Sequence, residues 1–175
     1  PFYISVIYSI KYKNEITINH LAWPKNPTLD NYIRVITENE QFLVGLKNSV
    51  LTTVPTIFLL MIVCSMAAWV LARNNTRFYS LMYVIMTMGT LIPFQCIMLP
   101  LYLNMFKAGL VSTNLGFIIA RAGLQVSISI LVITSFVKTV PRELEQAAQI
   151  DGCGKFQTFW RIVFPLLKPI NATQL

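Results

Sequence analysis

Two long stretches without a charged residue constrain the fold of this chain more than any other feature. The first covers the 25 positions between Lys47 and Arg73, and the second covers the 29 positions between Arg77 and Lys107. A helix needs about 20 mainly apolar residues to cross the hydrocarbon core of a bilayer, and each stretch is long enough to do so. The sequence therefore predicts an all-α protein with several membrane-spanning helices, a polytopic helical bundle.

The composition of the chain excludes several other classes of protein. Only 12% of its 175 residues are charged, whereas an ordinary soluble domain carries about 25%. A soluble globular enzyme, a disordered chain and a nucleic-acid-binding module are therefore poor interpretations. The net charge of +7 fits loops that face lipid headgroups, because positive residues gather at the ends of membrane spans.

Three membrane helices are expected between residues 48 and 138. The first ends before the polar turn at 73–77, the second covers about 78–106, and the third covers about 114–137. In the first helix Cys64, Ala68 and Ala72 recur at every fourth position, and such a small-residue face permits close contact with another helix. The same pattern also arises by chance in any alanine-containing helix, so both explanations stay open.

Polar and helix-breaking positions within these spans are candidates for a pathway or a helix interface: Pro93, Pro100, Arg121 and Gln125. The two prolines interrupt the second helix and free backbone carbonyls that a neighbour or a wet cavity must satisfy, although a kink is the simpler explanation of either one. Arg121 lies about seven residues, roughly 10 Å, from the start of its helix, so its guanidinium can also snorkel to the interface. Gln125 and the serines that follow it make the third helix the most polar of the three.

The flanking segments complete the predicted organisation. Residues 1–10 are expected to end a first membrane helix, 11–47 to form a mixed polar segment, and 166–175 to begin a further, truncated helix. We interpret the chain as a fragment of a longer membrane protein, because it begins inside one apolar run and stops where another begins. The single histidine and three scattered cysteines match no metal-ligand or disulfide spacing, so no metal site is expected.

The segment 139–165 is predicted to form two short amphipathic helices joined by a glycine bend. Pro141 suits the first turn of a helix, and two glutamates in that turn complement the positive end of the helix dipole. Asp151 and Gly152 end this helix, because glycine readily takes the left-handed conformation of a helix cap. Such a unit can dock into a groove on a partner protein and transmit a movement of that partner to the membrane helices.

Each of the two helices carries an apolar face at helical spacing. The first helix places Leu144, Ala147 and Ala148 on one small face, which would let another surface approach closely. The second helix has a larger stripe made of Phe156, Phe159, Trp160 and Val163. We expect this stripe to hold the unit against the membrane bundle.

The spacing of this segment resembles the EAA loop of the permease subunits of bacterial ATP-binding-cassette importers. The family pattern is Glu-Ala-Ala, three residues, Gly, nine residues, Ile, one residue and Leu-Pro. At the same spacing this chain has Gln146, Ala147, Ala148, Gly152, Ile162, Phe164 and Pro165. Gln146 stands in place of the glutamate, and Phe164 stands in place of the leucine, a conservative apolar change. The neighbouring Glu145 points about 100° away around the helix, so it does not simply substitute for the missing charge.

Other parts of the chain are similar to landmarks of carbohydrate importer permeases, most closely to the second permease of maltose-like systems. They are residues 28–32 (TLDNY), 47–50 (KNSV), 92–93 (IP), 99–102 (LPLY), 109–113 (GLVST) and 141–144 (PREL). The resemblance thus covers nearly all of the chain.

This resemblance implies the MetI-like permease fold and a multi-pass location in the bacterial inner membrane. It implies a second permease subunit, two cytoplasmic ATPase subunits that bind and hydrolyse ATP, an extracytoplasmic solute-binding protein, and contact with membrane lipid. The chain itself would then hold no cofactor and no catalytic residue, and would carry sugars or another small solute such as glycerol phosphate or an oligosaccharide derivative. The resemblance assigns coupling to the ATPase to Glu145, Gln146, Ala147, Ala148, Asp151, Gly152, Ile162 and Pro165.

The charge pattern leaves the orientation open. With residues 73–77 and 138–168 on one side of the membrane, seven Lys and Arg residues lie on that side and seven lie elsewhere. The cytoplasmic location of the segment 139–165 and the extracytoplasmic location of the segment 11–47 are therefore what the resemblance implies.

Two other functions have little support in the sequence. Ala148 and Gly152, with basic residues beyond them, mimic the turn of a DNA-binding helix-turn-helix, but apolar spans flank them on both sides. A membrane-embedded enzyme would need a cluster of catalytic side chains, and neither an H-E-x-x-H nor a G-x-S-x-G pattern occurs. We therefore expect a transport protein that binds no nucleic acid.

Overall fold

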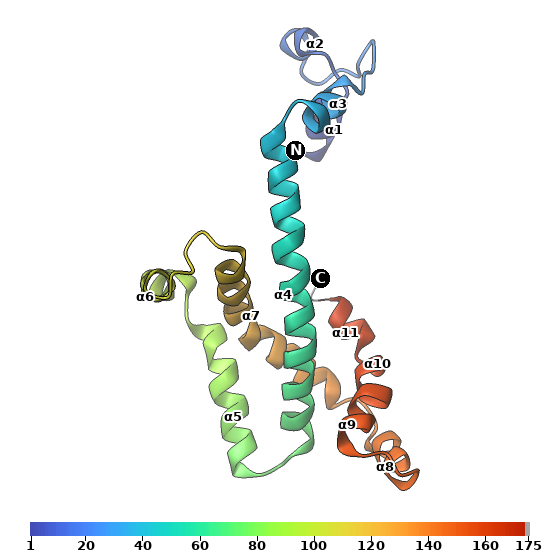
Figure 1. Cartoon of the computed structure of the whole chain (residues 1–175). Coiled ribbons are helices and arrows are strands. Elements are labelled where there is room, and N and C mark those ends of the chain that lie inside the picture. Colours follow the sequence, from blue (N-terminus) through green and yellow to red (C-terminus); the bar gives the residue numbers. More distant parts are fainter. Residues whose placement is uncertain (174–175) are drawn as a thin grey trace. The chain divides into compact units, whose positions relative to one another are not determined.

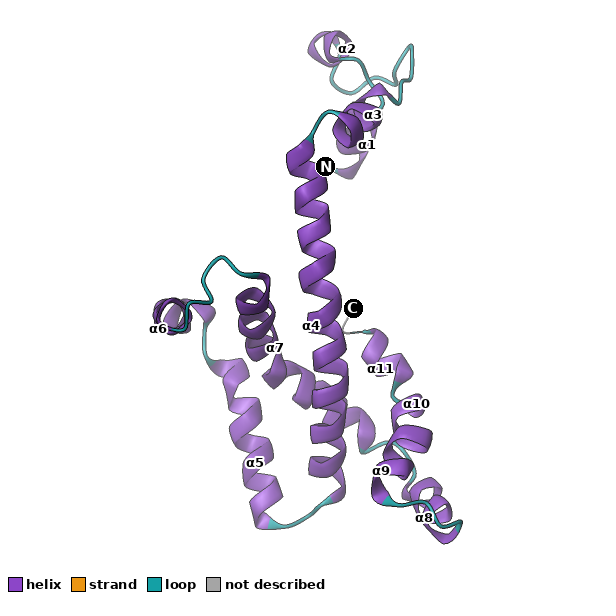
Figure 2. Cartoon of the chain, in the orientation of Figure 1, coloured by secondary structure: helices purple, strands orange, loops and turns teal. Residues whose placement is uncertain are grey.

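The computed structural model describes residues 1–173, which form helices joined by loops and turns, with no strand among them (Figure 2). They divide into two compact units, with the boundary between Val50 and Leu51. The first unit contains α1 (Phe2–Ser9), α2 (Lys13–Ile18), α3 (Asp30–Thr37) and the start of α4 (Glu40–Arg73). The second contains the rest of α4, α5 (Arg77–Met88), the 3-10 turn η1 (Gly89–Leu91), α6 (Phe94–Lys107), α7 (Asn114–Val137), α8 (Arg142–Ile150), α9 (Lys155–Thr158), the π turn η2 (Phe159–Val163), α10 (Phe164–Leu166) and α11 (Lys168–Ala172) (Figure 1).

Polar contacts organise much of the first unit. Lys11 is buried, and its Nζ donates to the carbonyl of Asn19 at 2.9 Å. The side-chain amide of Asn31 donates to the carbonyls of Ser9 and Lys11 at 3.1 and 2.8 Å. The eight residues of α1 rise about 12 Å, which is too short to cross a bilayer without further helix. The expected end of a first membrane helix at 1–10 therefore stays a prediction.

Among residues 1–173, two helices are each long and apolar enough to span a membrane, α4 with 34 residues and α7 with 24. They correspond to the first and third predicted spans. α4 begins well before the expected start at Asn48, because Asn39 caps it: its Oδ1 accepts from the N–H of Phe42 at 3.1 Å. The helix then continues through Pro55 without a break.

The second predicted span is not one continuous helix. α5 and α6 meet at a bend of 100°, with η1 between them. The break lies at Pro93, because a proline disfavours the helical conformation in the residue before it, and Ile92 is extended with φ −88° and ψ 115°. Pro100, by contrast, lies inside α6 and does not end it. Taken together, the bent pair has the length and composition of one further span.

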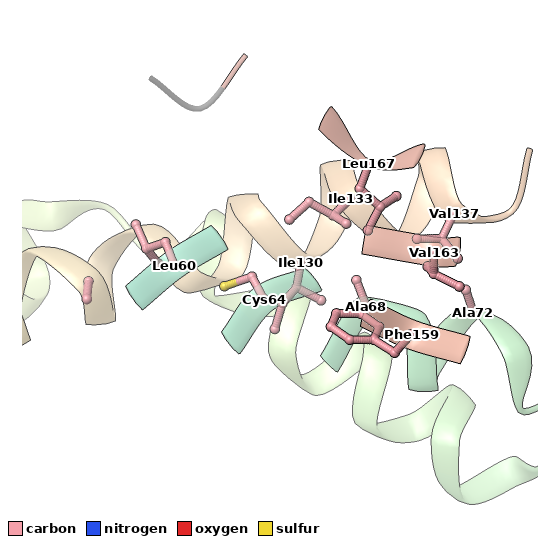
Figure 3. Close-up of a cluster of buried hydrophobic side chains, with 11 residues drawn as sticks. Leu60, Cys64, Ala68, Ala72, Ile130, Ile133, Val137, Phe159, Val163 and Leu167 are labelled. Atoms are coloured by element: carbon pink, nitrogen blue, oxygen red, sulfur yellow. The ribbon is translucent and has the colours of Figure 1, made fainter. Parts of the chain in front are cut away.

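The core of the second unit forms where three segments of chain meet (Figure 3). Its buried side chains come from α4, α7 and the stretch that begins at η2: Leu60, Cys64, Ala68, Ala72, Ala122, Ile130, Ile133, Val137, Phe159, Val163 and Leu167. Cys64 and Ala68 are fully buried and Ala72 is 5% exposed, so the small-residue face of α4 is packed against other helices. A buried polar contact adds to this packing, because the Ser65 hydroxyl donates to Asn171 Oδ1 at 3.2 Å.

Two glycines allow close contacts of α7. α5 and η1 lie beside this helix (Figure 1), and a Cβ on Gly89 of η1 would overlap the hydroxyl of Ser127. At the start of α7, Gly116 lies against the carbonyl of Leu110. The Thr113 hydroxyl caps the helix there by accepting from the Gly116 N–H at 3.0 Å. A side chain at position 116 would therefore displace the backbone of the preceding turn.

Replacement of Gly116 by alanine should destabilise the protein. The added methyl group would overlap the Leu110 carbonyl, and overpacking of this kind costs about 1–3 kcal/mol. Gly123→Ala on the same helix is the matched control, because no atom lies within 4 Å of the carbon added there. Thermal unfolding in detergent micelles, followed by circular dichroism, should show a lower midpoint for Gly116→Ala only. Equal midpoints for the two variants would contradict the close contact.

Candidate coupling site

The candidate coupling site is the segment 139–165, and its first part is the nine-residue helix α8. Pro141 directly precedes α8 with φ −57°, a value close to that of a helix, so it leads the chain into the first turn. Glu143 and Glu145 lie in that turn, where a negative charge is favourable beside the unpaired N–H groups. The predicted start of this helix is therefore found at the expected residues.

A Schellman cap ends α8. Gly152 has φ +85°, and its N–H donates to the carbonyl of Gln149 at 3.1 Å. The N–H of Cys153 donates to the carbonyl of Ala148 at 2.9 Å, which completes the motif. The left-handed glycine expected at this position is confirmed.

The second part of the segment contains a π turn, Phe159–Val163, that was not predicted from the sequence. The N–H of Phe164 donates to the carbonyl of Phe159, five residues earlier. Pro165 and Pro169 lack the N–H groups that a continuous α-helix requires here, and this favours irregular turns. Beyond residue 165, where a further helix is expected to begin, α10 ends at Leu166 and α11 covers Lys168–Ala172.

The predicted aromatic stripe packs against the bundle except at its first residue. Phe159 is 1% exposed and Val163 is fully buried, and the Phe159 ring lies 5.5 Å from the ring of Trp69 on α4. Trp160 is partly buried. The prediction is wrong for Phe156, which is 66% exposed, because its ring contacts Trp160 edge-on rather than the core.

α8 has a buried side and an exposed side, and the division differs from the predicted one. Glu145 and Ala148 are each 6% exposed. Gln146 and Ala147 are exposed, and Ile150 is 86% exposed. The expectation that Ala147 and Ala148 share a partner-facing surface is therefore wrong for Ala148, because this residue is buried within its own chain.

Glu145 is held by a buried ion pair with the end of α4. Its Oε1 accepts from Arg73 Nε at 2.7 Å and lies 2.6 Å from Nη2, and its Oε2 accepts from Trp69 Nε1 at 2.9 Å. Arg73 Nη2 also donates to the Val140 carbonyl at 2.9 Å. The two charged side chains are 12% and 9% exposed, and loss of one partner from a buried pair costs about 3–5 kcal/mol. The Glu145 carboxylate is therefore engaged inside the chain, unlike the ATPase contact that the resemblance assigns to it.

Arg73 and Trp69 are partners of this site that were not predicted from the sequence. The available signal is a single arginine that ends an apolar span, together with an acidic residue in the first turn of a later polar helix. A separation of 72 positions hides the pairing of Arg73 with Glu145. A cleft of about 340 Å³ lies beside the pair, and its lining includes Tyr79, Gln149 and Lys155.

The other predicted residues of the segment 139–165 differ in how far they are exposed. Asp151, Gly152 and Pro165 are exposed, and Ile162 is partly buried. The accessible part of the predicted set therefore consists of Gln146, Ala147, Asp151, Gly152 and Pro165, with Ile162 at its edge.

Of the predicted pathway residues, Gln125 lines a cavity of about 390 Å³ together with Leu60, Ile128, Ser129, Val132 and Thr173. That lining does not include Arg121, Pro93 or Pro100, whose side chains are exposed. Within the described residues 1–173, no group of three His, Cys, Asp or Glu side chains is placed to hold a metal ion.

Replacement of Gly152 by alanine should loosen the cap of α8. A residue with a Cβ pays about 1 kcal/mol or more in the left-handed conformation, which raises local opening roughly fivefold. The rate of trypsin cleavage after Lys155 should rise accordingly. Gly154→Ala is the control, because Gly154 has φ −68° and no atom lies within 4 Å of an added Cβ. Equal cleavage rates in the two variants would show that the cap does not depend on glycine.

Comparisons with known proteins identify the family. Residues 62–175 match the family model described as "Binding-protein-dependent transport system inner membrane component". The probable starch degradation products transport system permease protein AmyC of Thermoanaerobacterium thermosulfurigenes is 35% identical over 99% of this chain and 62% of its own length. The multiple sugar-binding transport system permease protein MsmG of Streptococcus mutans is 34% identical over 100% of this chain and 63% of its own length. The melibiose/raffinose/stachyose import permease protein MelC of Bacillus subtilis is 32% identical over 99% of this chain and 62% of its own length.

The chain thus spans 62–63% of the length of these relatives. The fold is similar to that of a solved structure, a bacterial ABC transporter involved in the import of the acidic polysaccharide alginate. The match has a TM-score of 0.83 and covers 99% of this chain and 60% of the matched chain. Its sequence is 23% identical, so the match concerns the fold, and it confirms the predicted MetI-like permease fold. The helical fold and the family match together show that the chain belongs to the inner-membrane components of binding-protein-dependent transport systems.

Proposed function

We propose that this chain is part of a membrane subunit of an ATP-driven importer for sugars or oligosaccharides. The support for the substrate class comes from the relatives, whose names concern starch degradation products, multiple sugars, and melibiose, raffinose and stachyose. The proposed protein crosses the bacterial inner membrane several times, with the segment 11–47 outside the cytoplasm and the segment 139–165 inside it.

The proposed importer divides its work among several subunits. A second permease completes the pathway, two cytoplasmic ATPase subunits bind and hydrolyse ATP, and an extracytoplasmic binding protein delivers the sugar. This chain contributes a wall of the pathway and the contact with one ATPase. ATP-driven closure of the ATPases would then shift the permease between two states.

One observation carries the proposed contact with the ATPase: α8 exposes an apolar residue outside the membrane spans while its opposite side is buried. Ile150 is 86% exposed, and the small Ala147 lies on the same side one turn earlier. An exposed apolar side of a capped helix is suited to a groove on another protein, in the manner of other helix-in-groove contacts. We refer to α8 as the coupling helix from here on.

The cavity beside Gln125 is the proposed contribution of this chain to the pathway. The Gln125 amide both donates and accepts hydrogen bonds, and the Ser129 hydroxyl in the same lining does likewise. Sugar hydroxyl groups need partners of this kind when they leave water. Leu60 and Val132 provide the apolar remainder of the wall.

Transport by the reconstituted complex tests the proposed function. The permease is purified with the subunits that accompany it and inserted into proteoliposomes, with the binding protein outside and ATP inside. Radiolabelled maltose, melibiose or raffinose should accumulate only when both ATP and the binding protein are present. Accumulation of glycerol 3-phosphate in place of every sugar would change the substrate class, and no ATP-dependent uptake of any of the four would refute an importer of this type.

Replacement of Ala147 by tryptophan should uncouple ATP hydrolysis from uptake. The residue is exposed, so the large ring leaves the chain folded but prevents close approach of the ATPase to the coupling helix. Gln146→Glu at the neighbouring exposed position is the matched control, because it restores the glutamate of the family pattern without adding bulk. We expect uptake to fall about tenfold or more in Ala147→Trp, a coupling effect within the usual range, and to persist in Gln146→Glu. Normal uptake by Ala147→Trp would remove this surface from the proposed contact.

A further inference from the structure

We propose that Arg73 is a positioning residue of the coupling helix, and that its ion pair with Glu145 fixes the rotation of this helix about its own axis. The inference rests on the proposed function, because it concerns how the ATPase-facing side of α8 is presented. It adds a residue of a membrane span, at the end of α4, to a site otherwise made of the segment 139–165.

The contacts of Glu145 hold its carboxylate from two directions. One oxygen receives Nε and Nη2 of Arg73 at 2.7 and 2.6 Å, and the other receives Nε1 of Trp69 at 2.9 Å. Trp69 and Arg73 lie one helical turn apart on α4, so both point from the same side of that helix. Because both carboxylate oxygens are occupied, rotation of Glu145 in either direction breaks a charge-assisted hydrogen bond.

Other contacts between α8 and the bundle do not supply this constraint. The helix has nine residues, and Ala148 is its only buried apolar residue among the described side chains. A single methyl group fits its surroundings over a range of rotations. The Glu145 carboxylate, by contrast, has a defined geometry, because Arg73 holds one of its oxygens and Trp69 holds the other. With the pair intact, Glu145 and Ala148 face inward and Ala147 and Ile150 face outward.

The pair also joins the coupling helix to the end of a long membrane helix. Arg73 is the last residue of α4, and its Nη2 donates in addition to the Val140 carbonyl, just before α8, at 2.9 Å. Arg142 Nη2 in turn approaches the Arg73 carbonyl at 3.5 Å. A displacement of α8 by its ATPase is therefore delivered to α4 directly, and not only through the helices that follow α8 in sequence.

Arg73→Met and Arg73→Lys, compared in the complete transporter, test the inference. The measured quantity is sugar transported per ATP hydrolysed, with the radiolabelled sugar that the wild-type complex accumulates. Loss of the guanidinium in Arg73→Met should lower this ratio about tenfold, as expected when a coupling free energy is removed. Arg73→Lys keeps the positive charge but has one nitrogen in place of Nε and Nη2. Its ratio of sugar transported to ATP hydrolysed should therefore lie between those of Arg73→Met and the wild type. Arg77→Met is the matched control, because Arg77 is an exposed arginine at the start of the next helix, and it should keep the wild-type ratio.

A double-mutant cycle separates positioning by the pair from separate effects of the two residues. Glu145→Gln alone should lower the amount of sugar transported per ATP hydrolysed. The double variant, Arg73→Met with Glu145→Gln, should transport no less sugar per ATP than the poorer single variant, because both single changes remove the same interaction. Additive losses in the double variant would overturn the inference.

Labelling of Cys153 by a maleimide provides a readout that does not need the ATPase. Cys153 is partly exposed and donates its N–H to the cap of α8, so its reactivity reports the orientation of that helix. In a Cys96→Ser background, its labelling should become about fivefold faster in Arg73→Met, since local opening exposes the cap. Cys64 is buried in the core and should stay unlabelled, which shows that the bundle remains folded.

The outcomes distinguish the inference from the proposed function. A wild-type complex without ATP-dependent uptake would refute the proposed function, and the labelling of Cys153 would still decide the role of Arg73. A wild-type complex that couples, with an unchanged ratio and unchanged Cys153 labelling in Arg73→Met, would overturn the inference. If Arg73→Met does not assemble, the same comparison is made between Arg73→Lys and Arg77→Lys, and equal ratios and labelling rates there would overturn it as well.

Discussion

The close packing of small residues on α4 is the constraint on which the rest of the second unit depends. In lipid, helices gain no hydrophobic free energy by meeting, so association relies on close contact and on hydrogen bonds between helices. Cys64 and Ala68 are fully buried, and they allow α7 and the turn at Phe159 to approach the same stretch of α4. The buried contact between Ser65 and Asn171 joins α11 to that stretch as well. Since α4 continues from this packed region to Arg73, the position of its polar end is determined by the core.

The coupling helix shows how an exposed element is held without a large apolar interface. Two devices act on it: the Schellman cap at Gly152 sets where the helix ends, and the ion pair of Glu145 sets which side faces inward. An ion pair is sensitive to geometry, whereas apolar contacts tolerate sliding. A short helix that has to present one side to another protein therefore benefits from a charged anchor, even though a buried pair contributes little to stability overall.

Much of this architecture could be predicted from the sequence, and the failures share a physical reason. The uncharged stretch 48–72 predicted the apolar part of α4, and the third expected span, about 114–137, predicted α7. Pro141 and Gly152 predicted the two ends of α8, including its left-handed glycine. The interruption of the second span was predicted from its prolines and is found at Pro93, but hydropathy does not report the direction of a helix, so the 100° bend was not predicted. Periodicity places residues on a face of a helix but does not say what that face meets, which is why Ala148 was assigned to the partner surface. The pairing of Arg73 with Glu145 depends on the tertiary arrangement, and no local pattern reports it.

Because of the π turn at Phe159–Val163, the length of the segment 139–165 also determines how the helix that follows it is rotated. A π turn contains about one residue more than an α-helical turn, and one extra residue rotates everything beyond it by about 100°. With that rotation in place, Leu167 is fully buried and its neighbour Leu166 is 39% exposed. A chain with one residue fewer between Gly152 and Pro165 would turn a different side of the following helix toward the core. The number of residues between Gly152 and Pro165 thus determines which side of α11 faces the bundle, while α8 stays accessible to the proposed ATPase.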